Sequence, residues 1–281
     1  MSEISKAVLI TGCSTGIGRT TAEHLARRGL TVYATARRPE SIEGLKGSGC
    51  RTVALDVTDE ASMAAAVAAV EEAEGAVGAL VNNAGYSQNG AVETVALEDV
   101  RRQFETNVFG LLRMSQLVLP GMRRQGHGRI VNVSSMGGKL TFPGGGIYHA
   151  TKHAVEALSD AMRFEVRGFG VDVSVIEPGL IKTSFAETSV GSVSQDEGPY
   201  AEFNKAVAAA TAGAYDGPLA KLGGGPEAVA KVIEKAITAE RPRTRYKVTA
   251  SARLLMAQRS LLPDRAWDAV VGTSFPRPGR T

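Results

Sequence analysis

The sequence predicts an α/β fold in which a single domain, residues 1–281, is built on a parallel sheet. Strand-like and helix-like segments alternate along most of the chain, which is typical of βαβ units. The first strand, residues 7–10, is apolar throughout, as expected of a strand buried on both faces of a parallel sheet. A glycine-rich turn follows this strand and leads directly into a helix. With 43% hydrophobic residues, the chain has enough apolar material for one large core.

Composition and charge exclude several classes of protein. The net charge is +3 and the charged residues are dispersed, so the sequence indicates no nucleic-acid partner. The densest basic cluster, residues 241–247, is interpreted as a solvated turn entering an edge strand rather than a phosphate-binding patch. No apolar run approaches the ~18–20 residues of a membrane span. No apolar signal-peptide stretch opens the chain either, so we expect a cytoplasmic location.

The two cysteines, Cys13 and Cys50, lack the spacing of a disulfide framework or a zinc site. This predicts a protein of a reducing compartment with no metal site. Cys13 is interpreted as a small side chain that fills the glycine-rich turn rather than as a reactive thiol.

The glycine-rich turn has the form of a phosphate cradle. Gly12 permits the turn, Gly16 lets a pyrophosphate approach the backbone, and Gly18 lets the helix expected over residues 20–28 pack closely on the strand. Three residues separate the first two glycines, which departs from the GxGxxG spacing. The strand–turn–helix context nevertheless favours a nucleotide site over a purely structural turn. The turn contains three further candidate contacts, namely Ser14, Thr15 and Ile17.

The second strand, residues 31–36, ends where a dinucleotide fold meets the adenosine ribose. An acidic residue at this place would bind the 2′-hydroxyl of NAD. Here Ala36 is followed by Arg37 and Arg38, whose guanidinium groups can pair with a 2′-phosphate. The sequence therefore favours NADP(H) over NAD(H). Surface exposure before a turn is a credible alternative for Arg38 and less so for Arg37.

Two later strands end in polar residues at the same predicted edge of the sheet. The third strand, residues 51–55, leads into Asp56 and Val57, and Asp56 could contact adenine or equally stabilise a turn. The fourth strand, residues 79–81, runs into Asn82-Asn83-Ala84-Gly85. These two amides suit hydrogen bonding across the sheet as readily as contact with a ligand.

Two more polar positions are candidates for chemistry. Asn107 lies inside a helical pattern over residues 97–124, where asparagine is unfavourable. We expect a compensating hydrogen bond that kinks the helix, with solvent exposure as the alternative. Ser135 follows the fifth strand, residues 129–133. A serine at the carboxyl end of a parallel strand can hydrogen-bond a substrate oxygen, or it can satisfy a turn.

The most informative segment is Tyr148-His149-Ala150-Thr151-Lys152. Tyr148 and Lys152 begin a predicted helix and lie one turn apart on the same face. At about 4–5 Å, an ammonium favours phenolate by roughly 3–4 kcal/mol, which predicts that the pKa of Tyr148 falls toward neutrality. Such a tyrosine could give and take a proton at physiological pH. The spacing alone also fits ordinary packing, so the other motifs must decide.

The last third of the chain is less regular. After the sixth strand, residues 171–176, the pattern dissolves over residues 184–225, which we expect to form an irregular or weakly helical substrate lid. The C-terminal extension, residues 250–281, is expected to be frayed. A further helix and a last strand are predicted over residues 226–239 and 246–249.

The combination of these motifs resembles one family, the short-chain dehydrogenases/reductases, in their compact single-domain branch. The resemblance covers about residues 6–250, and its motifs are specific jointly although each alone is weak. They occur in the family's order and spacing: Thr11-Gly12-x-x-x-Gly16-Ile17-Gly18, Asn82-Asn83-Ala84-Gly85, Asn107, Ser135, Tyr148-x-x-x-Lys152 and Pro178-Gly179-x-x-x-Thr183.

The resemblance implies a doubly wound parallel sheet of about seven strands, the Rossmann fold, with helices on both faces. It also implies that Tyr148 is the catalytic acid/base and that Ser135 holds and polarises the substrate oxygen. Lys152 would bind the nicotinamide ribose and lower the pKa of Tyr148, and Asn107 would hold a water that links Lys152 to solvent. The implied cofactor contacts are Ser14 and Arg37 at the 2′-phosphate and, toward the nicotinamide, Asn83, Ala84, Gly85, Pro178, Gly179, Ile181 and Thr183.

The resemblance further implies an oxidoreductase that exchanges a hydride between NADP(H) and a carbonyl or secondary alcohol. Met136, Leu140 and Phe142 suggest an apolar substrate, such as a steroid, retinoid or acyl derivative, but they could equally be lid packing. The two long helices suggest a homodimer or homotetramer. The alternative from another class is a non-catalytic NADPH-binding sensor or scaffold, which the intact set of catalytic positions disfavours. A related epimerase or dehydratase is disfavoured by the glycine spacing and the lack of a substantial C-terminal domain.

Overall fold

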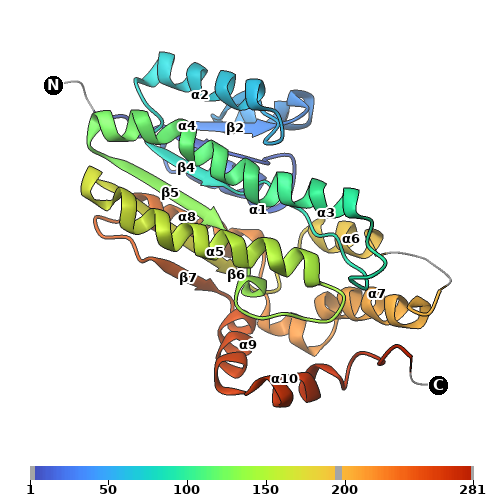
Figure 1. Cartoon of the computed structure of the whole chain (residues 1–281). Helices are drawn as coiled ribbons and strands as arrows, with labels where there is room; N and C mark the ends of the chain where they lie inside the picture. Colours follow the sequence, from blue (N-terminus) through green and yellow to red (C-terminus); the bar gives the residue numbers. More distant parts are fainter. Residues whose placement is uncertain (1–3, 194–197, 280–281) are drawn as a thin grey trace.

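The computed structural model describes residues 4–193 and 198–279. Within these residues, seven parallel strands form one sheet in the order β3-β2-β1-β4-β5-β6-β7, with helices on both faces (Figure 1). This confirms the predicted fold class. The strands are β1 (Val8–Ile10), β2 (Val32–Ala36), β3 (Arg51–Ala54), β4 (Ala79–Asn82), β5 (Gly128–Val133), β6 (Val171–Pro178) and β7 (Arg245–Val248).

Helices and short turns connect the strands. The α-helices are α1 (Gly16–Arg27), α2 (Glu60–Glu74), α3 (Leu97–Phe104), α4 (Gly110–Gln125), α5 (Gly146–Val166), α6 (Phe185–Gly191), α7 (Ala201–Asp216), α8 (Pro226–Thr238), α9 (Ala250–Leu261) and α10 (Asp264–Val271). Short 3₁₀ helices are η1 (Pro39–Ser48), η3 (Met136–Gly138), η4 (Arg167–Phe169) and η5 (Pro218–Leu222). A π-helical turn, η2 (Glu105–Phe109), lies between α3 and α4. Among the described residues, no helix combines the length and the apolar content needed to cross a membrane.

The strand order changes direction between β1 and β4. The chain passes outward from β1 to β2 and β3, and then returns to β4 on the other side of β1. Leu9 of β1 pairs in register with Tyr33 of β2 and with Leu80 of β4. In open parallel sheets, ligands bind outside the carboxyl ends of the strands at such a switch point.

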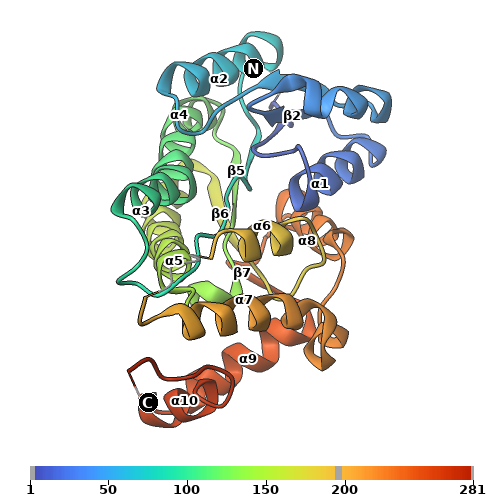
Figure 2. The same cartoon turned by 90° about the vertical axis from the view of Figure 1, so that its right-hand side faces the viewer.

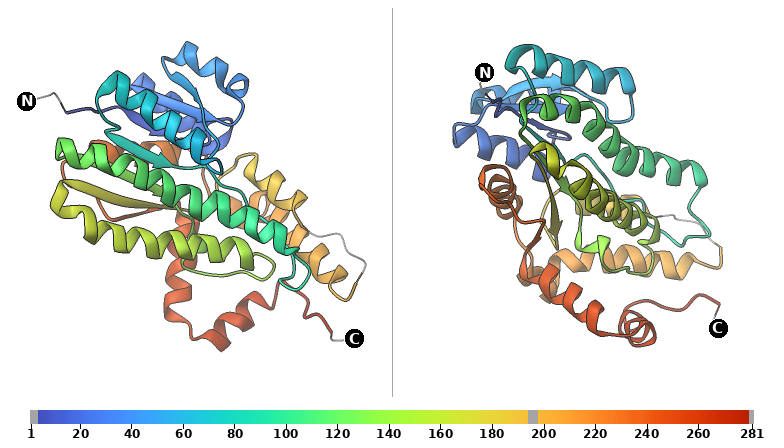
Figure 3. Two further views of the ribbon diagram at one scale, coloured as in Figure 1. Left: turned by 45° about the horizontal axis from the view of Figure 1, so that its top comes forward. Right: turned by 60° about the vertical axis from the view of Figure 1, so that its left-hand side comes forward.

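Two apolar layers make the core, one on each face of the sheet. Because successive side chains of a strand point to opposite faces, Val8 and Ile10 contact α1 and α8, whereas Leu9 lies in the layer covered by α2, α4 and α5. Figures 1 and 3 show α4 and α5 lying next to each other across one face of the sheet.

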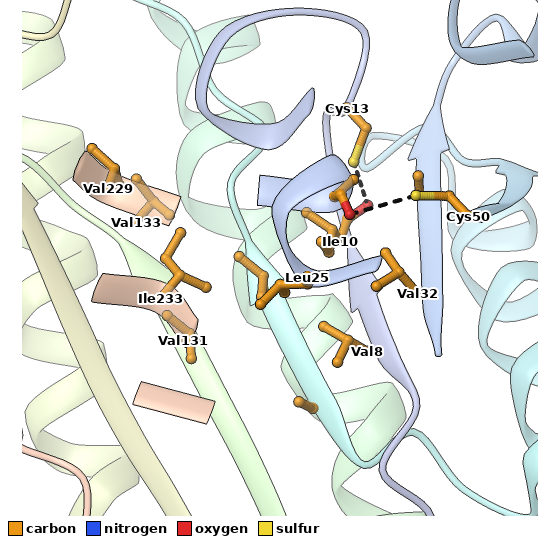
Figure 4. Close-up of a cluster of buried hydrophobic side chains, with 14 of the residues drawn as sticks. Val8, Ile10, Cys13, Leu25, Val32, Cys50, Val131, Val133, Val229 and Ile233 are labelled. Atoms are coloured by element: carbon orange, nitrogen blue, oxygen red, sulfur yellow. Dashed lines mark hydrogen bonds between the residues drawn. The ribbon is translucent and has the colours of Figure 1, made fainter. Parts of the chain in front are cut away.

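The two cysteines lie in the layer beneath α1 (Figure 4). Both are buried free thiols, and their Sγ atoms donate to the carbonyl oxygens of Ile10 and Ala22 at 3.3 and 3.5 Å. Burial raises the pKa of Cys13 to about 12, so its thiol stays protonated. This supports the predicted packing role of Cys13.

The C-terminal extension forms α9 and α10, so the predicted fraying is wrong for residues 250–271, while residues 280 and 281 lie outside the described part of the chain. Figures 1 and 2 show α9 and α10 at the bottom of the molecule. Trp267 of α10 is 5% exposed and packs with Leu140, Ala252 and Met256. This third apolar cluster lies outside the two layers on the sheet and belongs largely to the C-terminal extension. The predicted lid region contains α6 and α7, while its residues 194–197 lie outside the described part of the chain.

Candidate active site

The glycine-rich turn lies at the carboxyl end of β1. Gly12 and Gly16 have φ angles of 73° and 57°, which L side chains rarely adopt. A Cβ on Gly18 would lie 2.3 Å from the carbonyl oxygen of Gly12, so only glycine lets α1 start so close to the turn. Thr15, at the N-cap of α1, makes no capping side-chain hydrogen bond among the described residues. The first-turn N–H groups are therefore available to a phosphate, as the predicted cradle requires.

The loop after β4 holds this turn in place. Asn83 Nδ2 donates to the carbonyl oxygens of Thr11 at 2.9 Å and of Gly12 at 3.0 Å. Thr11 Oγ1 accepts from the backbone N–H groups of Asn83 and Ala84, each at 3.0 Å. Asn82 instead donates to Asn132 Oδ1 in the neighbouring strand at 2.9 Å. Both asparagine side chains thus make the internal hydrogen bonds that the sequence left as one of two alternatives.

Two other predicted cofactor contacts lie at the same edge of the sheet. Arg37 is exposed immediately after β2. Asp56 Oδ1 accepts from the backbone N–H of Thr58 at 2.9 Å and from its hydroxyl at 2.8 Å. This geometry supports the turn-stabilising alternative for Asp56. Val57 is buried beside it, and its side chain belongs to the core layer beneath α2.

Asn107 interrupts the long helix, as predicted. It is 1% exposed in the π-helical turn η2, which separates α3 from α4. Its Oδ1 accepts from the backbone N–H of Tyr86 at 3.1 Å, and its Nδ2 donates to the carbonyl oxygen of Tyr86 at 2.9 Å and to Thr151 Oγ1 at 3.1 Å. These bonds exclude the alternative of solvent exposure and tie η2 both to the loop after β4 and to α5.

Lys152 lies beside Tyr148 at the start of α5. Its Nζ is 5.8 Å from the centroid of the Tyr148 ring and donates to the carbonyl oxygen of Val133 at 2.9 Å. Lys152 is only 6% exposed. Burial lowers the pKa of Lys152 to about 8, and the negative charge of Glu156 opposes this shift.

The pKa of Tyr148 moves in the direction opposite to the prediction. Burial raises it above its ordinary value, and a hydrogen bond with the Ser135 side chain offsets only part of that rise. The tyrosine ring packs against Phe185 of α6, with the ring centroids 5.7 Å apart. The predicted fall toward neutrality is wrong here because the phenol is desolvated, while the Lys152 amine is bonded to Val133.

Ser135 completes the group. Its Oγ accepts from the backbone N–H of Gly137 at 3.0 Å, and its side chain lies near enough to Tyr148 to lower the pKa of the phenol. A Cβ on Gly85 would lie 3.1 Å from Asn107 Oδ1 and 3.7 Å from Lys152 Nζ. The structure thus brings Ser135, Tyr148, Lys152 and Asn107 together at the carboxyl ends of β4 and β5.

The segment after β6 runs past the glycine-rich turn. A Cβ on Gly16 would lie 3.3 Å from the Cβ of Thr183, and Ser184 Oγ donates to Thr15 Oγ1 at 3.1 Å. Ile181 forms a β-bridge with Gly224. The turn at Pro178 and Gly179 ends β6 and packs against α9, with a Cβ on Gly179 placed 2.4 Å from Ser251 Oγ.

Sequence reasoning missed several residues that shape this group. Thr151 and Val133 bond Asn107 and Lys152 through a hydroxyl and a carbonyl oxygen. Phe185 and Tyr215 from the lid region contact or influence Tyr148. The place of Thr151 between Tyr148 and Lys152 was a usable signal, whereas a backbone carbonyl leaves none in the sequence.

Comparisons with known proteins agree with this geometry. A family model described as "short chain dehydrogenase" matches residues 6–192. The NADPH-dependent 3-dehydrocapnine reductase of Ornithobacterium rhinotracheale is 33% identical, over 93% of this chain and 94% of the relative. The 17-beta-hydroxysteroid dehydrogenase type 6 of Bos taurus is 34% identical, over 98% of this chain and 90% of the relative. The crystal structure of a short-chain dehydrogenase from Streptomyces avermitilis superposes with a TM-score of 0.77 at 32% identity, over 97% of this chain and 95% of that chain.

Proposed function

The chain belongs to the short-chain dehydrogenase family and is an oxidoreductase, and from this premise we propose that it transfers a hydride between NADP(H) and a carbonyl or secondary alcohol. The observation that carries the proposal is the convergence of Tyr148, Ser135 and Lys152 beside a glycine-rich turn whose helix N-terminus can accept a phosphate. When bound, the nicotinamide supplies or takes the hydride. The protein supplies placement and proton transfer.

Tyr148 is the proposed proton donor in the direction of reduction. As a hydride adds to the carbonyl carbon, the electron pair of the C=O bond moves to oxygen, which takes the phenolic proton. The raised pKa of Tyr148, which burial causes, keeps the phenol protonated at neutral pH and therefore able to donate. Ser135, which lies near that phenol, would donate a hydrogen bond to the same oxygen. Donors aimed at developing negative charge contribute about 2.7–4 kcal/mol each in other enzymes.

Lys152 and Asn107 support the proton transfer in this proposal. The Lys152 ammonium would stabilise the phenolate that remains and would bind the nicotinamide ribose. Asn107 Oδ1 accepts one hydrogen bond, from Tyr86, and a carbonyl oxygen has a second lone pair with which to hold a water. Such a water would carry protons between Lys152 and solvent.

A preference for NADP(H) is supported by the residues at the end of β2. Ala36 is followed by the exposed Arg37, and the position where NAD-binding folds place a carboxylate has none. A guanidinium group can bind a 2′-phosphate through two parallel hydrogen bonds. Ser14, also exposed, lies in the adjacent turn and would donate to the same phosphate. The name of the Ornithobacterium relative, an NADPH-dependent reductase, supports the same preference.

An apolar substrate of steroid, retinoid or acyl type is the proposed class. All three residues first considered for this role, Met136, Leu140 and Phe142, pack in the C-terminal cluster around Trp267. The support therefore comes from Phe185, whose ring packs at a tilt against Tyr148 from the proposed lid of residues 184–225. The hydroxysteroid dehydrogenase relative adds to this support.

A homodimer or homotetramer formed through α4 and α5 is also proposed. Phe109, just before α4, is 51% exposed, and Phe164 on α5 is 89% exposed. Large exposed aromatic side chains are typical of surfaces that another subunit covers. The mass of the purified protein by light scattering tests this part of the proposal, and a monomer at micromolar concentration contradicts it.

The free cysteines agree with the predicted cytoplasmic location, which stays a prediction.

A substrate screen tests the proposed reaction. The purified protein is mixed with NADPH and a panel of aldehydes, ketosteroids, retinal and acyl ketones, and loss of NADPH absorbance is followed. We expect oxidation of NADPH that depends on at least one apolar carbonyl compound. Tight NADPH binding with no turnover on any member of the panel would instead support a non-catalytic sensor or scaffold.

A further inference from the structure

Two buried carboxyl groups lie behind the proposed active site, between the sheet and α5. Glu156 follows Lys152 by one helical turn and is 3% exposed, and Glu177 of β6 is 0% exposed. Arg245 Nε lies 3.0 Å from Glu156 Oε2 and 3.4 Å from Glu177 Oε1, so the two carboxyl groups share one guanidinium group. Lys139 Nζ lies 3.0 Å from the same Oε2 atom of Glu156.

The hydrogen bonding of this pair is incomplete. Among the described residues, Glu156 Oε1 and both oxygens of Glu177 have no hydrogen-bond donor. An ionised carboxylate that is buried without donors is strongly destabilising. A single proton on Glu177 reduces this penalty, because it neutralises one of the two carboxylates that share the Arg245 guanidinium group.

The surrounding charges favour one proton on the pair. Glu177 faces Arg245 and Lys247 of β7, Lys139 of the loop before α5, and Glu156 of α5. Arg245 also donates two hydrogen bonds to Asp160, at 2.6 and 2.7 Å, so its charge is divided among three carboxyl groups. Burial and, to a smaller extent, the neighbouring Glu156 raise the pKa of Glu177 to about 7.

We propose that Glu156 and Glu177 form an acid pair that shares one proton at neutral pH, and that the pair is a positioning group for Lys152. Glu177 carries the proton and Glu156 carries the negative charge. That charge lies one turn from Lys152 and stabilises its buried ammonium. The part that concerns Lys152 rests on the proposed function, whereas the shared proton does not depend on any activity.

The shared proton is tested without an activity assay. When the pKa of a carboxyl group is higher in the folded than in the unfolded protein, the protein loses stability as the pH rises between the two pKa values. For Glu177 this range runs from 4.5 to about 7. The variant Glu177→Gln keeps a donor and cannot ionise. Its free energy of unfolding in urea should therefore rise relative to that of the wild type across this pH range. If the difference in free energy of unfolding between Glu177→Gln and the wild type stays constant above pH ~5.5, the proposal is overturned, because Glu177 then ionises as an ordinary glutamate does.

A matched control shows whether the effect is specific to Glu177, and a second measurement decides if the variant does not fold. Glu202→Gln removes a carboxylate that is paired with Lys205 on the surface of α7, and its difference from wild type should stay flat. If Glu177→Gln does not fold, infrared spectra of the wild type decide. A protonated carboxyl band that persists at pH 6 supports the pair, and its disappearance below pH ~5 overturns it.

The effect on Lys152 is tested through the pH dependence of turnover. Removing the anion in Glu156→Gln should lower the pKa of Lys152 by about one unit or more, so that turnover at pH 8 falls about fivefold while turnover at pH 6 changes little. Glu156→Asp, which restores the charge, should recover most of the loss. An equal loss at both pH values indicates a purely structural role and overturns this part. If the wild type reduces no carbonyl compound, the proposed function fails, and the unfolding experiment still decides on the shared proton.

Discussion

Asn107 Nδ2 donates a hydrogen bond to Thr151 Oγ1 at 3.1 Å, and this contact joins the π-helical turn η2 to the helix that carries Tyr148 and Lys152. Thr151 Oγ1 in turn donates to the carbonyl oxygen of Tyr148 at 2.7 Å. The same asparagine bonds both backbone groups of Tyr86. A single amide therefore fixes the start of α5 relative to the loop after β4.

Replacing this amide should cost stability as well as activity. We expect Asn107→Ala to lower the free energy of unfolding by about 2–4 kcal/mol, because it removes three buried hydrogen bonds and leaves the backbone N–H of Tyr86 unpaired. Urea unfolding of the two proteins measures the change. Thr106→Ala, its neighbour in the same turn, is the control and should cost less than about 1 kcal/mol. Equal effects of the two substitutions would contradict the bridging role of Asn107.

Removing the phenolic hydroxyl should separate binding from chemistry. Tyr148→Phe keeps the ring that packs on Phe185, so we expect NADPH to bind nearly as tightly as in the wild type. Turnover should fall by about 10²–10⁴-fold, the range for loss of a general acid. Fluorescence titration with NADPH and a ketone reduction assay provide the two measurements. Tyr200→Phe, whose hydroxyl donates to Glu93 at 2.6 Å on the surface, should keep wild-type turnover. A Tyr148→Phe enzyme of normal rate is incompatible with the proposed role.

The parts of this architecture that are local in sequence could be predicted. Apolar strands followed by glycine or asparagine identified the sheet, the phosphate cradle and the loop after β4. The unfavourable place of Asn107 inside a helical pattern predicted a kink, and a buried π-helical turn is found there. In each case the residues that indicate the structure are within a few positions of the structure itself in the sequence.

The parts that depend on distant residues could not be predicted. The direction of the Tyr148 pKa shift is set by burial, and Phe185 packs on the Tyr148 ring from the lid region. Tyr215, also in the lid region, raises the same pKa electrostatically. The extension after β7 folds because Trp267 packs against Leu140, which lies more than a hundred residues earlier in the sequence. Periodicity within a segment carries no information about such partners, since propensity is overridden by tertiary packing.

Cofactor choice gives a third prediction. If Arg37 binds a 2′-phosphate, Arg37→Ala should weaken NADPH binding by about tenfold or more, since hydrogen bonds between charged groups contribute about 1.5–3 kcal/mol. NADH binding should change by less than about twofold, because NADH lacks that phosphate. Isothermal titration with each cofactor measures both constants. Arg38→Ala serves as the matched control, and an equal loss of both cofactors in Arg37→Ala would rule out the phosphate contact.

The alkaline limb of the pH profile should belong to Lys152. Burial lowers the pKa of Lys152 to about 8, so its ammonium is present below this pH and is lost as the pH rises through it. Tyr148 has a raised pKa and stays protonated over the same range. We therefore expect ketone reduction at saturating NADPH to decline above pH ~8.

The variant Lys152→Arg tests that assignment, because a guanidinium group keeps its charge to pH ~12 and beyond. Its maximal rate should be lower than that of the wild type, since the longer planar group does not reproduce the ammonium contact. The decline near pH 8 should nevertheless be absent from its profile. If Lys152→Arg loses activity at the same alkaline pH as the wild type, the decline belongs to another group than Lys152.

The C-terminal extension should be required for stability. Trp267 is 5% exposed, its ring lies 5.9 Å from that of Phe142, and its Nε1 donates to the carbonyl oxygen of Thr141 at 3.2 Å. We expect Trp267→Ala to cost about 3–5 kcal/mol in the free energy of unfolding, the range for truncating a buried tryptophan. Leu261→Ala, at an 82% exposed position on α9, should cost less than about 0.5 kcal/mol. Because Thr141 and Phe142 belong to the loop that leads into α5, Trp267→Ala should also reduce turnover at temperatures where the protein remains folded. A Trp267→Ala protein with the stability of Leu261→Ala would show that α10 only rests on the domain without holding that loop.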